Sequence, residues 1–370
     1  MPESQNNIKY LIALSFIKGV GSVTARQLIS YLGSAEAIFK ASKASLQKIP
    51  GVGPVLASNL KDINAIVLAE KELEFADRYH IDILSYTESN YPKLLKECND
   101  APLVLYQKSK YKFNDTYYIS IVGTRKPSPY GEKYCKQLIE SLAVSKIPIV
   151  IVSGLAYGID ACAHKSALEF GLPTIAVLGH GLDLIYPSSH KQVATSIINN
   201  GSLLTEFPQG TKPARSNFVS RNRIIAGLSE ATIVIESATK GGSLITADFA
   251  FGYNREVLAL PGRADDLKSG GCNFLIKTQK ATMYESFDDL VKVLNWDTLK
   301  GTQTKINVAQ NLSEEQLKLY QWMKSQADFC SIDRINIQSG LNKNIIPALL
   351  LDLEFLNLVK AIPGGQYQIL

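Results

Sequence analysis

The chain has few of the residues that build metal sites and disulfide frameworks. It has five cysteines and four histidines among 370 residues, and no two cysteines form a CxxC pair. Zinc sites and thiol redox motifs need such close spacing, and a disulfide-stapled fold needs cysteines in paired number. We therefore expect a reduced, cytoplasmic protein with no structural metal and no cofactor.

Long apolar runs are missing as well. The longest, such as 147–152 and 174–178, are far shorter than the roughly 20 residues that span a bilayer. The first residues also lack the basic start and apolar stretch of a signal peptide. The sequence thus predicts no membrane segment, and its length predicts two or three globular domains.

Two common nucleotide-binding signatures are absent from the sequence. It contains no GxxxxGK[ST] pattern and no GxGxxG after the first strand expected in its middle segment. These absences argue against a nucleoside triphosphatase and against a nicotinamide-dependent enzyme.

Residues 1–80 are expected to form a helical domain interrupted by glycine turns. Ile17–Ala25 and Ile49–Ala57 are alike, and each has an apolar residue, then Gly-Val-Gly, then a small residue that opens a new helix. The glycines permit a tight turn, and the following helix N-terminus suits a phosphate. The pattern resembles the helix-hairpin-helix motif of DNA-binding proteins. A compact module that uses the hairpins only for packing fits the pattern equally well.

Residues 81–300 alternate apolar strands with helices, which predicts an α/β domain. Such alternation is typical of a Rossmann-like, doubly wound, mainly parallel sheet covered on both faces. Ligands of such sheets bind at the carboxyl ends of the strands. The expected strands are 117–122, 147–152, 174–178, 203–207, 231–235 and 256–260, and the expected helices include 131–146, 190–200 and 243–253.

Residues 308–370 are expected to form a third domain of three short helices and a terminal hairpin, which resembles a winged helix. The stretch Leu299–Gln310 is a plausible linker before it. The domain has 5 Lys+Arg against 6 Asp+Glu, and a strong DNA reader would be basic. A protein-contact or packing role is therefore favoured for it.

Small residues that could hold an anion follow several of the expected strands. One loop contains an arginine that can bind a phosphate with two hydrogen bonds, and another opens a helix with two glycines. Loops at the same edge of one sheet converge, so together they favour a phosphate-binding rim. The candidate binding residues in these loops are Gly123, Thr124, Arg125, Ser153, Gly154, Gly241, Gly242, Ser243 and Thr246.

A cationic stripe runs through Gln209–Ser229, which contains no acidic residue. Its cations could follow the backbone of a single-stranded nucleic acid while an aromatic ring stacks on an exposed base. The alternatives are core packing for the ring and, for two of the arginines, binding of backbone carbonyls to hold loops in place. The candidate residues in the stripe are Lys212, Arg215, Phe218, Arg221, Asn222 and Arg223.

These motifs resemble the DNA-processing protein A family (DprA, also called Smf). The resemblance covers about residues 80–300, and its most specific blocks are Ser220–Ser229 and Gly242–Ala247. Val122–Arg125, Ser153–Asp160, Gly179–Asp183 with Tyr186-Pro187, and Leu260–Gly262 carry it as well.

The resemblance implies a function and partners. Members of the family bind and protect single-stranded DNA during natural transformation, load the recombinase RecA onto it, and dimerise through the Rossmann-like domain. No catalysis is implied. Carried over by position, Arg125 would bind a phosphate, Arg215 would be a basic contact and Phe218 would meet a base. Ser188 stands where some members carry a DNA-contacting lysine, which Lys191 could replace.

Two other functions remain open alternatives. The fold also resembles that of nucleotide-hydrolysing phosphoribohydrolases, whose PGGxGTxxE motif supplies a glutamate for the chemistry. The corresponding stretch Thr239–Asp248 lacks that glutamate, and Asp248 is displaced. A duplex-DNA binder that uses the first and last domains is the other alternative, and the acidic balance of residues 308–370 argues against it.

Overall fold

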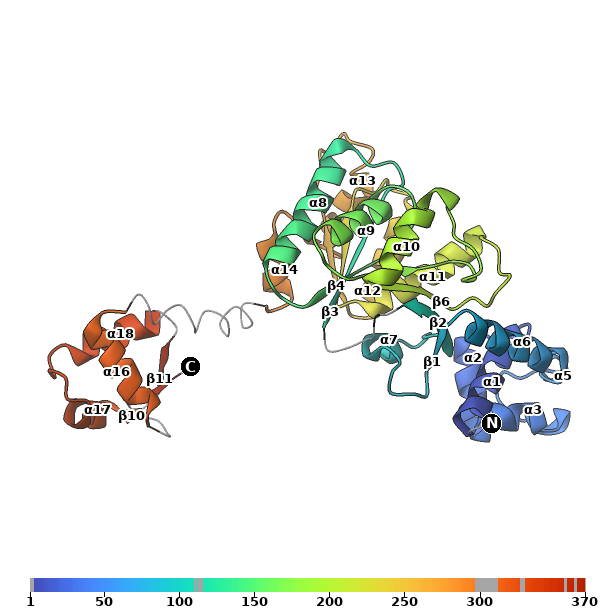
Figure 1. Ribbon diagram of the computed structural model, residues 1–370, viewed down its shortest axis with the longest axis horizontal. Coiled ribbons are helices and arrows are strands. Elements are labelled where there is room, and N and C mark those ends of the chain that lie inside the picture. Colours follow the sequence, from blue (N-terminus) through green and yellow to red (C-terminus); the bar gives the residue numbers. More distant parts are fainter. Residues whose placement is uncertain are drawn as a thin grey trace. The chain divides into compact units, whose positions relative to one another are not determined.

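The structure is a computed structural model that describes residues 3–109, 111, 116–296, 312–326, 330–355, 358–362 and 365–369 (Figure 1). The chain divides into two compact units, Met1–Leu294 and Asn295–Leu370, each described here by itself. The expected linker Leu299–Gln310 lies outside the described residues.

The first unit begins with helices separated by glycine turns. Gly19 and Gly51 have φ values of +89° and +81°, a conformation that glycine adopts without strain. Each turn is followed by a second glycine that precedes the next helix, as the repeated pattern predicts. Six helices result, namely α1 (Glu3–Phe16), α2 (Ser22–Leu32), α3 (Ala35–Lys40), α4 (Lys43–Leu46), α5 (Pro54–Asn59) and α6 (Asn64–Arg78).

A nine-stranded sheet forms the centre of the first unit. Its strand order is β1-β2-β6-β5-β4-β3-β7-β8-β9, and every pair from β6 to β9 is parallel. Strands β4 to β7 are buried along their whole length, because helices cover both faces. The strands are β1 (Asp82–Ser85), β2 (Val104–Ser109), β3 (Tyr117–Gly123), β4 (Ile149–Ser153), β5 (Thr174–Val177), β6 (Gly201–Thr205), β7 (Ala231–Ile235), β8 (Glu256–Ala259) and β9 (Thr282–Met283).

Helices cover the two faces of this sheet. On one face α9 packs against α8 and α10, and on the other α11 packs against α12. Alternate residues of one strand serve the two cores, since Ile175 of β5 lies in the α11 core and Ala176 in the α10 core. The helices are α7 (Lys93–Glu97), α8 (Pro129–Val144), α9 (Ile159–Glu169), α10 (Lys191–Asn199), α11 (Arg215–Leu228), α12 (Gly242–Gly252), α13 (Gly270–Lys277) and α14 (Phe287–Val293). The expected doubly wound, mainly parallel α/β fold is therefore confirmed.

Strands β1 and β2 were not among the expected strands. Strand β2 pairs antiparallel with both β1 and β6 and extends the parallel sheet at one edge. Val104 and Tyr106 of β2 share a buried core with the N-terminal helices, in which Leu11 and Leu28 also lie. The helical segment is thus joined to the sheet by apolar packing on β2, the neighbour of edge strand β1 (Figure 1).

The described residues of the second unit form three helices and a three-stranded sheet with the order β10-β12-β11. This matches the predicted three helices and terminal hairpin, although two turn residues, 363 and 364, lie outside the described residues. Its own core includes Leu319, Ile335, Leu350 and Leu353. The elements are α16 (Glu314–Lys324), β10 (Cys330–Ser331), α17 (Ile332–Gln338), α18 (Ile346–Phe355), β11 (Val359–Ile362) and β12 (Gln366–Ile369).

In the described parts of both units, no helix has the length and apolar character needed to cross a membrane.

Candidate functional site

A groove of about 750 Å³ lies at the carboxyl end of the parallel strands. From β3 the chain winds outward through β4, β5 and β6, and then returns to add β7 on the other side of β3. The two crossovers diverge at this point, which is where open α/β sheets bind ligands. The groove is lined by the end of β3, the residues after β7, the first turns of α12 and one side of α11.

The loop after β3 is held close to its neighbours. A Cβ atom on Gly123 would lie 2.0 Å from the carbonyl oxygen of Ile235, so only glycine fits there. The backbone N–H of Thr124 donates to the carbonyl of Glu236 at 2.8 Å, and the Thr124 carbonyl accepts from the N–H of Ile159 at 3.1 Å. Arg125 follows this fixed backbone, and its exposed side chain lines the groove.

The N-terminus of α12 opens into the groove. Gly241 precedes the helix, and none of the described side chains caps its first N–H groups. Ser243 and Thr246 line the groove one turn apart, and the Ser243 hydroxyl is fixed by a 2.9 Å hydrogen bond to Ser237. Exposed Lys240 adds a positive charge beside the helix end. Free N–H groups, the positive end of the helix dipole and a lysine suit an anion such as a phosphate.

Helix α11 supplies the opposite wall. Arg215, Phe218 and Asn222 follow each other at helical spacing and all line the groove. The Phe218 ring rests on Gly179, where an added Cβ would lie 2.7 Å from the ring. Its centroid is 5.7 Å from that of Tyr186, with the two rings inclined by 31°. Phe218 is half-buried, so one part of the ring packs against the protein while the rest faces the groove.

Arg221 lies beneath the groove rather than reaching across it. Its side chain is 4% exposed, and Nη1 donates to the carbonyls of Gly154, at 2.7 Å, and Val177. Burial lowers the pKa of Arg221 to about 10, although the Asp160 carboxylate opposes the shift. A Cβ on Gly154 would lie 2.2 Å from the guanidinium, so this glycine makes room for Arg221. The arginine binds backbone carbonyls, which is the alternative that the sequence left open.

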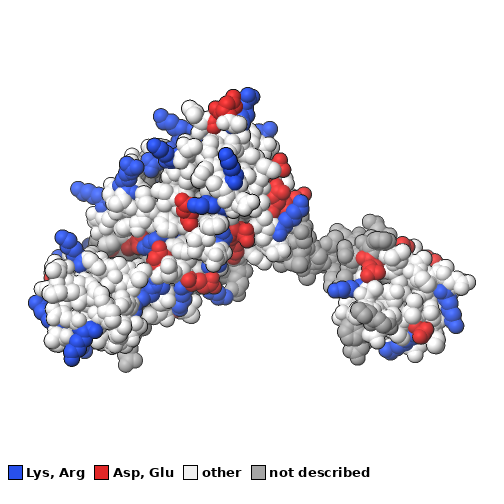
Figure 2. Space-filling model, turned by 180° about the vertical axis from the view of Figure 1, so that it is seen from behind, with Lys and Arg blue, Asp and Glu red and all other residues white. Residues whose placement is uncertain are grey.

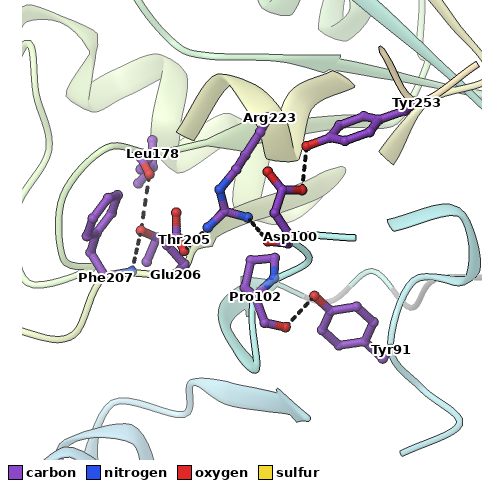
Figure 3. A network of polar contacts seen from close by, with 9 residues as sticks. All are labelled: Tyr91, Asp100, Pro102, Leu178, Thr205, Glu206, Phe207, Arg223 and Tyr253. Atoms are coloured by element: carbon purple, nitrogen blue, oxygen red, sulfur yellow. Dashed lines mark hydrogen bonds and ion pairs between the residues drawn. The ribbon is translucent and has the colours of Figure 1, made fainter. Parts of the chain in front are cut away.

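Arg223 points away from the groove into a network of polar contacts (Figure 3). Its Nη1 donates to the carbonyl of Asp100 at 2.6 Å, and its Nη2 forms an ion pair with Glu206. The hydroxyl of Tyr253 donates to the Asp100 carboxylate at 2.5 Å. Burial raises the pKa of Glu206, and the neighbouring Arg223 opposes that shift. Arg223 thus ties together the end of β6, the segment before β2 and the end of α12.

Three further predicted site residues, Ser153, Gly154 and Lys212, do not line the groove. Ser153 is buried and its hydroxyl donates to the carbonyl of Ile121 at 2.6 Å, which links β4 to β3. Lys212 is exposed on the loop that leads into α11. The predicted site residues that line the groove are Gly123, Thr124, Arg125, Arg215, Phe218, Arg221, Asn222, Gly241, Gly242, Ser243 and Thr246.

Sequence reasoning gave no role to three groove residues, Tyr186, Lys240 and Asp160. Tyr186 belongs to the long loop after β5, and its distance from the strand end concealed its position. Lys240 directly precedes the two glycines of the α12 turn, a position that could have suggested a phosphate contact. Asp160 is buried close to Arg221, and burial raises its pKa while the arginine opposes that shift.

On the face shown in Figure 2, lysines and arginines are spread over the first unit, and acidic side chains lie among them toward its centre. The groove itself is lined by the exposed cations Arg125, Arg215 and Lys240. Among the described residues, no group of three or more His, Cys, Asp and Glu side chains could hold a metal ion. Asp248, which the hydrolase alternative would need, is not among the groove residues and forms an ion pair with Lys280 at 2.7 Å.

Two family models match this chain. A family model described as DNA recombination-mediator protein A matches residues 82–295, which include every groove element. The chain belongs to the DNA recombination-mediator protein A family. A second model, a SAM-like helix-hairpin-helix tandem, matches residues 11–63, where the two glycine turns lie. The resemblances inferred from the Gly-Val-Gly repeat and from the middle segment are both confirmed.

Two relatives match this chain over different lengths. Protein Smf of Synechocystis is 34% identical, and the match covers 97% of this chain and 98% of that protein. DNA processing protein DprA of Streptococcus pneumoniae is 41% identical over 52% of this chain and 67% of its own length.

Solved structures of the family share the fold. The X-ray structure of DNA processing protein A from Streptococcus pneumoniae has a TM-score of 0.66 at 32% identity, covering 77% of this chain and 97% of that one. A structure of the Helicobacter pylori protein has a TM-score of 0.53 at 32% identity, covering 59% and 96%. That second structure gives insight into the single-stranded DNA binding mode of the Helicobacter pylori protein.

Proposed function

We propose that this member of the recombination-mediator family binds single-stranded DNA in the groove between α11 and α12 and leaves it chemically intact. The observation that carries the proposal is the composition of the groove. Exposed Arg125, Arg215 and Lys240 surround a helix N-terminus that no described side chain caps, and a pair of aromatic rings lies beside them.

The cations and the helix end account for phosphate binding. Arginines at the mouth of the groove can each form two hydrogen bonds to a phosphate, and the α12 N–H groups need an acceptor. A polynucleotide offers phosphates at regular spacing, so several of these groups can be satisfied at once. Each cation that contacts a phosphate releases a counterion, which makes the affinity fall as salt rises.

The aromatic pair favours a single strand over a duplex. In a duplex the faces of the bases are covered by their neighbours, whereas an unpaired base can expose its face to a ring. Phe218 and Tyr186 line the same groove as the phosphate-binding groups, so a base and its own phosphate can be held together. Stacking contributes roughly 1–3 kcal/mol per base and tolerates any sequence.

The carboxylates near the groove support binding without hydrolysis. A general acid or base must reach the reacting bond with its proton available. Asp160, the acidic residue that lines the groove, is 8% exposed and lies close to the Arg221 guanidinium. Glu236 is also buried, and its carboxylate accepts hydrogen bonds from the N–H and hydroxyl of Ser128.

The wider role follows from the family resemblance and from the relatives. We assign residues 81–300 to strand binding, residues 1–80 to a helix-hairpin-helix module and residues 308–370 to a winged-helix-like module that makes protein contacts. The bound strand is passed to the recombinase RecA during recombination or natural transformation, and the chain acts as a homodimer through its α/β domain. The Helicobacter pylori relative, whose structure concerns single-stranded DNA binding, supports the choice of ligand. The five free cysteines fit the reducing cytoplasm.

Fluorescence anisotropy with labelled oligo-dT tests the proposal. We expect tight binding at low salt, a linear fall of log K with log salt, and competition by unlabelled single strands but not by duplex of equal length. Gel analysis of the recovered oligonucleotide should show no cleavage, and incubation with a nucleoside monophosphate should release no free base. Preference for duplex, or release of base, would overturn the proposal.

A further inference from the structure

A third exposed aromatic ring lies directly beside the groove. Ala156 lines the groove, and the next residue, Tyr157, has a side chain that is 49% exposed. Tyr157 belongs to the loop between β4 and α9, at the same edge of the sheet as Tyr186 and Phe218, which follow β5 and β6. Aromatic rings therefore follow three adjacent strands, β4, β5 and β6, and the rings after β5 and β6 line the groove.

The backbone that carries Tyr157 is fixed on both sides. A Cβ on Gly154 would meet the buried Arg221 guanidinium at 2.2 Å, and one on Gly158 would lie 2.2 Å from the carbonyl oxygen of Thr124. Gly158 also has a φ of +80°, which favours glycine. The loop is thus held against the same Thr124 backbone that positions Arg125. A ring on such a backbone loses little conformational freedom when it contacts a ligand.

Two neighbours hold the Tyr157 ring in place while about half of its side chain stays exposed. The hydroxyl of Ser189 donates to the Tyr157 hydroxyl at 3.3 Å. The buried His190 ring packs against Tyr157 in a T-shaped pair, with centroids 5.0 Å apart and planes inclined by 68°. Both supports come from the segment that begins at Tyr186, so the positions of the two tyrosines are linked through a few residues of chain.

We infer that Tyr157 is a second base-stacking platform, over which the single strand leaves the groove toward the carboxyl ends of β4 and β5. This inference rests on the proposed function of the groove and adds the direction of the strand beyond it. Exposed Lys126 follows Arg125, whose backbone lies beside Gly158, and exposed Lys191 follows His190, which contacts Tyr157, so both segments that border the Tyr157 loop carry a lysine. A single-strand path needs this alternation of a ring for the base and cations for the backbone.

Oligonucleotides of two lengths distinguish the contribution of Tyr157 to binding from that of the groove. A short oligo-dT of about four nucleotides can be held by the groove alone, whereas one of about twenty must continue beyond it. We expect Tyr157→Ala to weaken binding of the long oligonucleotide roughly tenfold and to leave the short one almost unchanged. The salt dependence should stay the same because stacking releases no counterion, and Tyr157→Phe should bind both lengths like the wild type.

Phe251→Ala is the matched control, because Phe251 is 51% exposed near the end of α12 and does not line the groove. It should bind both lengths normally. Photocrosslinking of full-length protein to oligo-dT that carries 5-iodouracil, followed by mass spectrometry, gives an independent readout that folding defects do not affect. A crosslinked peptide containing Tyr157 supports the inference.

The alternative is that Tyr157 only packs its own loop. In that case Tyr157→Ala lowers the melting temperature, long and short oligonucleotides lose affinity together, and no crosslink forms at Tyr157, which overturns the inference. The groove is tested separately by Arg125→Ala. If the wild type binds oligo-dT, Arg125→Ala weakens both lengths and Tyr157→Ala weakens neither, the groove stands and only the Tyr157 platform fails.

Discussion

Arg215 and Arg221 lie six residues apart on α11, and their side chains meet opposite surroundings. Arg215 begins the helix and is exposed at the groove. Arg221 is buried, binds two backbone carbonyls and lies close to Asp160. The cationic stripe of the sequence is therefore two structures, an exposed first turn that can meet a ligand and a buried middle that holds the loops in place.

The largest expected effect is a loss of stability on substitution of Arg221, the buried arginine of this pair. Arg221→Ala leaves the Asp160 carboxylate buried without its compensating charge and frees the carbonyls of Gly154 and Val177. We expect a loss of about 3–5 kcal/mol in the free energy of unfolding, measured by urea denaturation. Arg215→Ala, on the exposed turn, should change stability by less than about 0.5 kcal/mol. Equal stability of the two variants would show that burial does not distinguish these arginines.

The segment leading into the exposed turn has an anchor of its own. The Glu72 carboxylate of α6 accepts the N–H of Gln209 at 3.1 and 3.0 Å from its two oxygens. Burial raises the pKa of Glu72 from 4.5 to about 7, with the hydrogen bond from Gln209 opposing the shift and the charge of Asp183 adding to it. Between pH 4.5 and 7, the Glu72 carboxyl group is therefore protonated in the folded protein and ionised in the unfolded chain. The contribution of Glu72 to stability is therefore complete below pH 4.5 and declines as the pH rises toward 7.

Thermal or urea denaturation at several pH values between 4.5 and 7 tests whether the stability falls as the pH rises. Glu72→Gln keeps an oxygen for Gln209 but cannot ionise, so its stability should fall less with rising pH than that of the wild type. The difference between the two proteins should grow by up to about 3 kcal/mol from pH 4.5 to 7, because one pKa unit corresponds to about 1.4 kcal/mol. Parallel pH profiles would contradict the raised pKa.

The network around Arg223 gives a smaller expected effect, because this arginine is less buried than Arg221. Its side chain is 11% exposed and that of Glu206 is 15% exposed. We expect Arg223→Ala to cost about 2 kcal/mol of unfolding free energy through the unpaired Glu206 and the lost bond to the Asp100 carbonyl. A double-mutant cycle with Glu206→Gln should show a coupling energy of about 1 kcal/mol or more. Additive effects would mean that the ion pair contributes little.

The parallel strands could be predicted from the sequence more readily than the contacts that each arginine makes. Strands β4 to β7 are buried on both faces, so β4 and β7 appear as continuous β-branched runs. Antiparallel β1 and β2 lie at the sheet edge beside the N-terminal helices, and their short mixed runs gave no such pattern. The family resemblance, carried over by position, indicated Arg215 and Phe218 as ligand contacts. It gave no information on whether Arg221 faces a ligand or a layer of carbonyls, because that depends on loops far away in the sequence.

The smallest expected effects separate the two kinds of contact within the exposed turn. Arg215→Ala should weaken oligo-dT binding by about 1 kcal/mol and reduce the salt slope by about 0.7, because one phosphate contact is lost. Phe218→Ala should weaken binding by roughly 1–3 kcal/mol with an unchanged salt slope, because stacking releases no counterion. Anisotropy titrations at several salt concentrations measure both quantities. Phe218 also packs on Gly179, so a lower melting temperature with unchanged affinity would assign this ring to packing alone and leave the phosphate contacts to carry the groove.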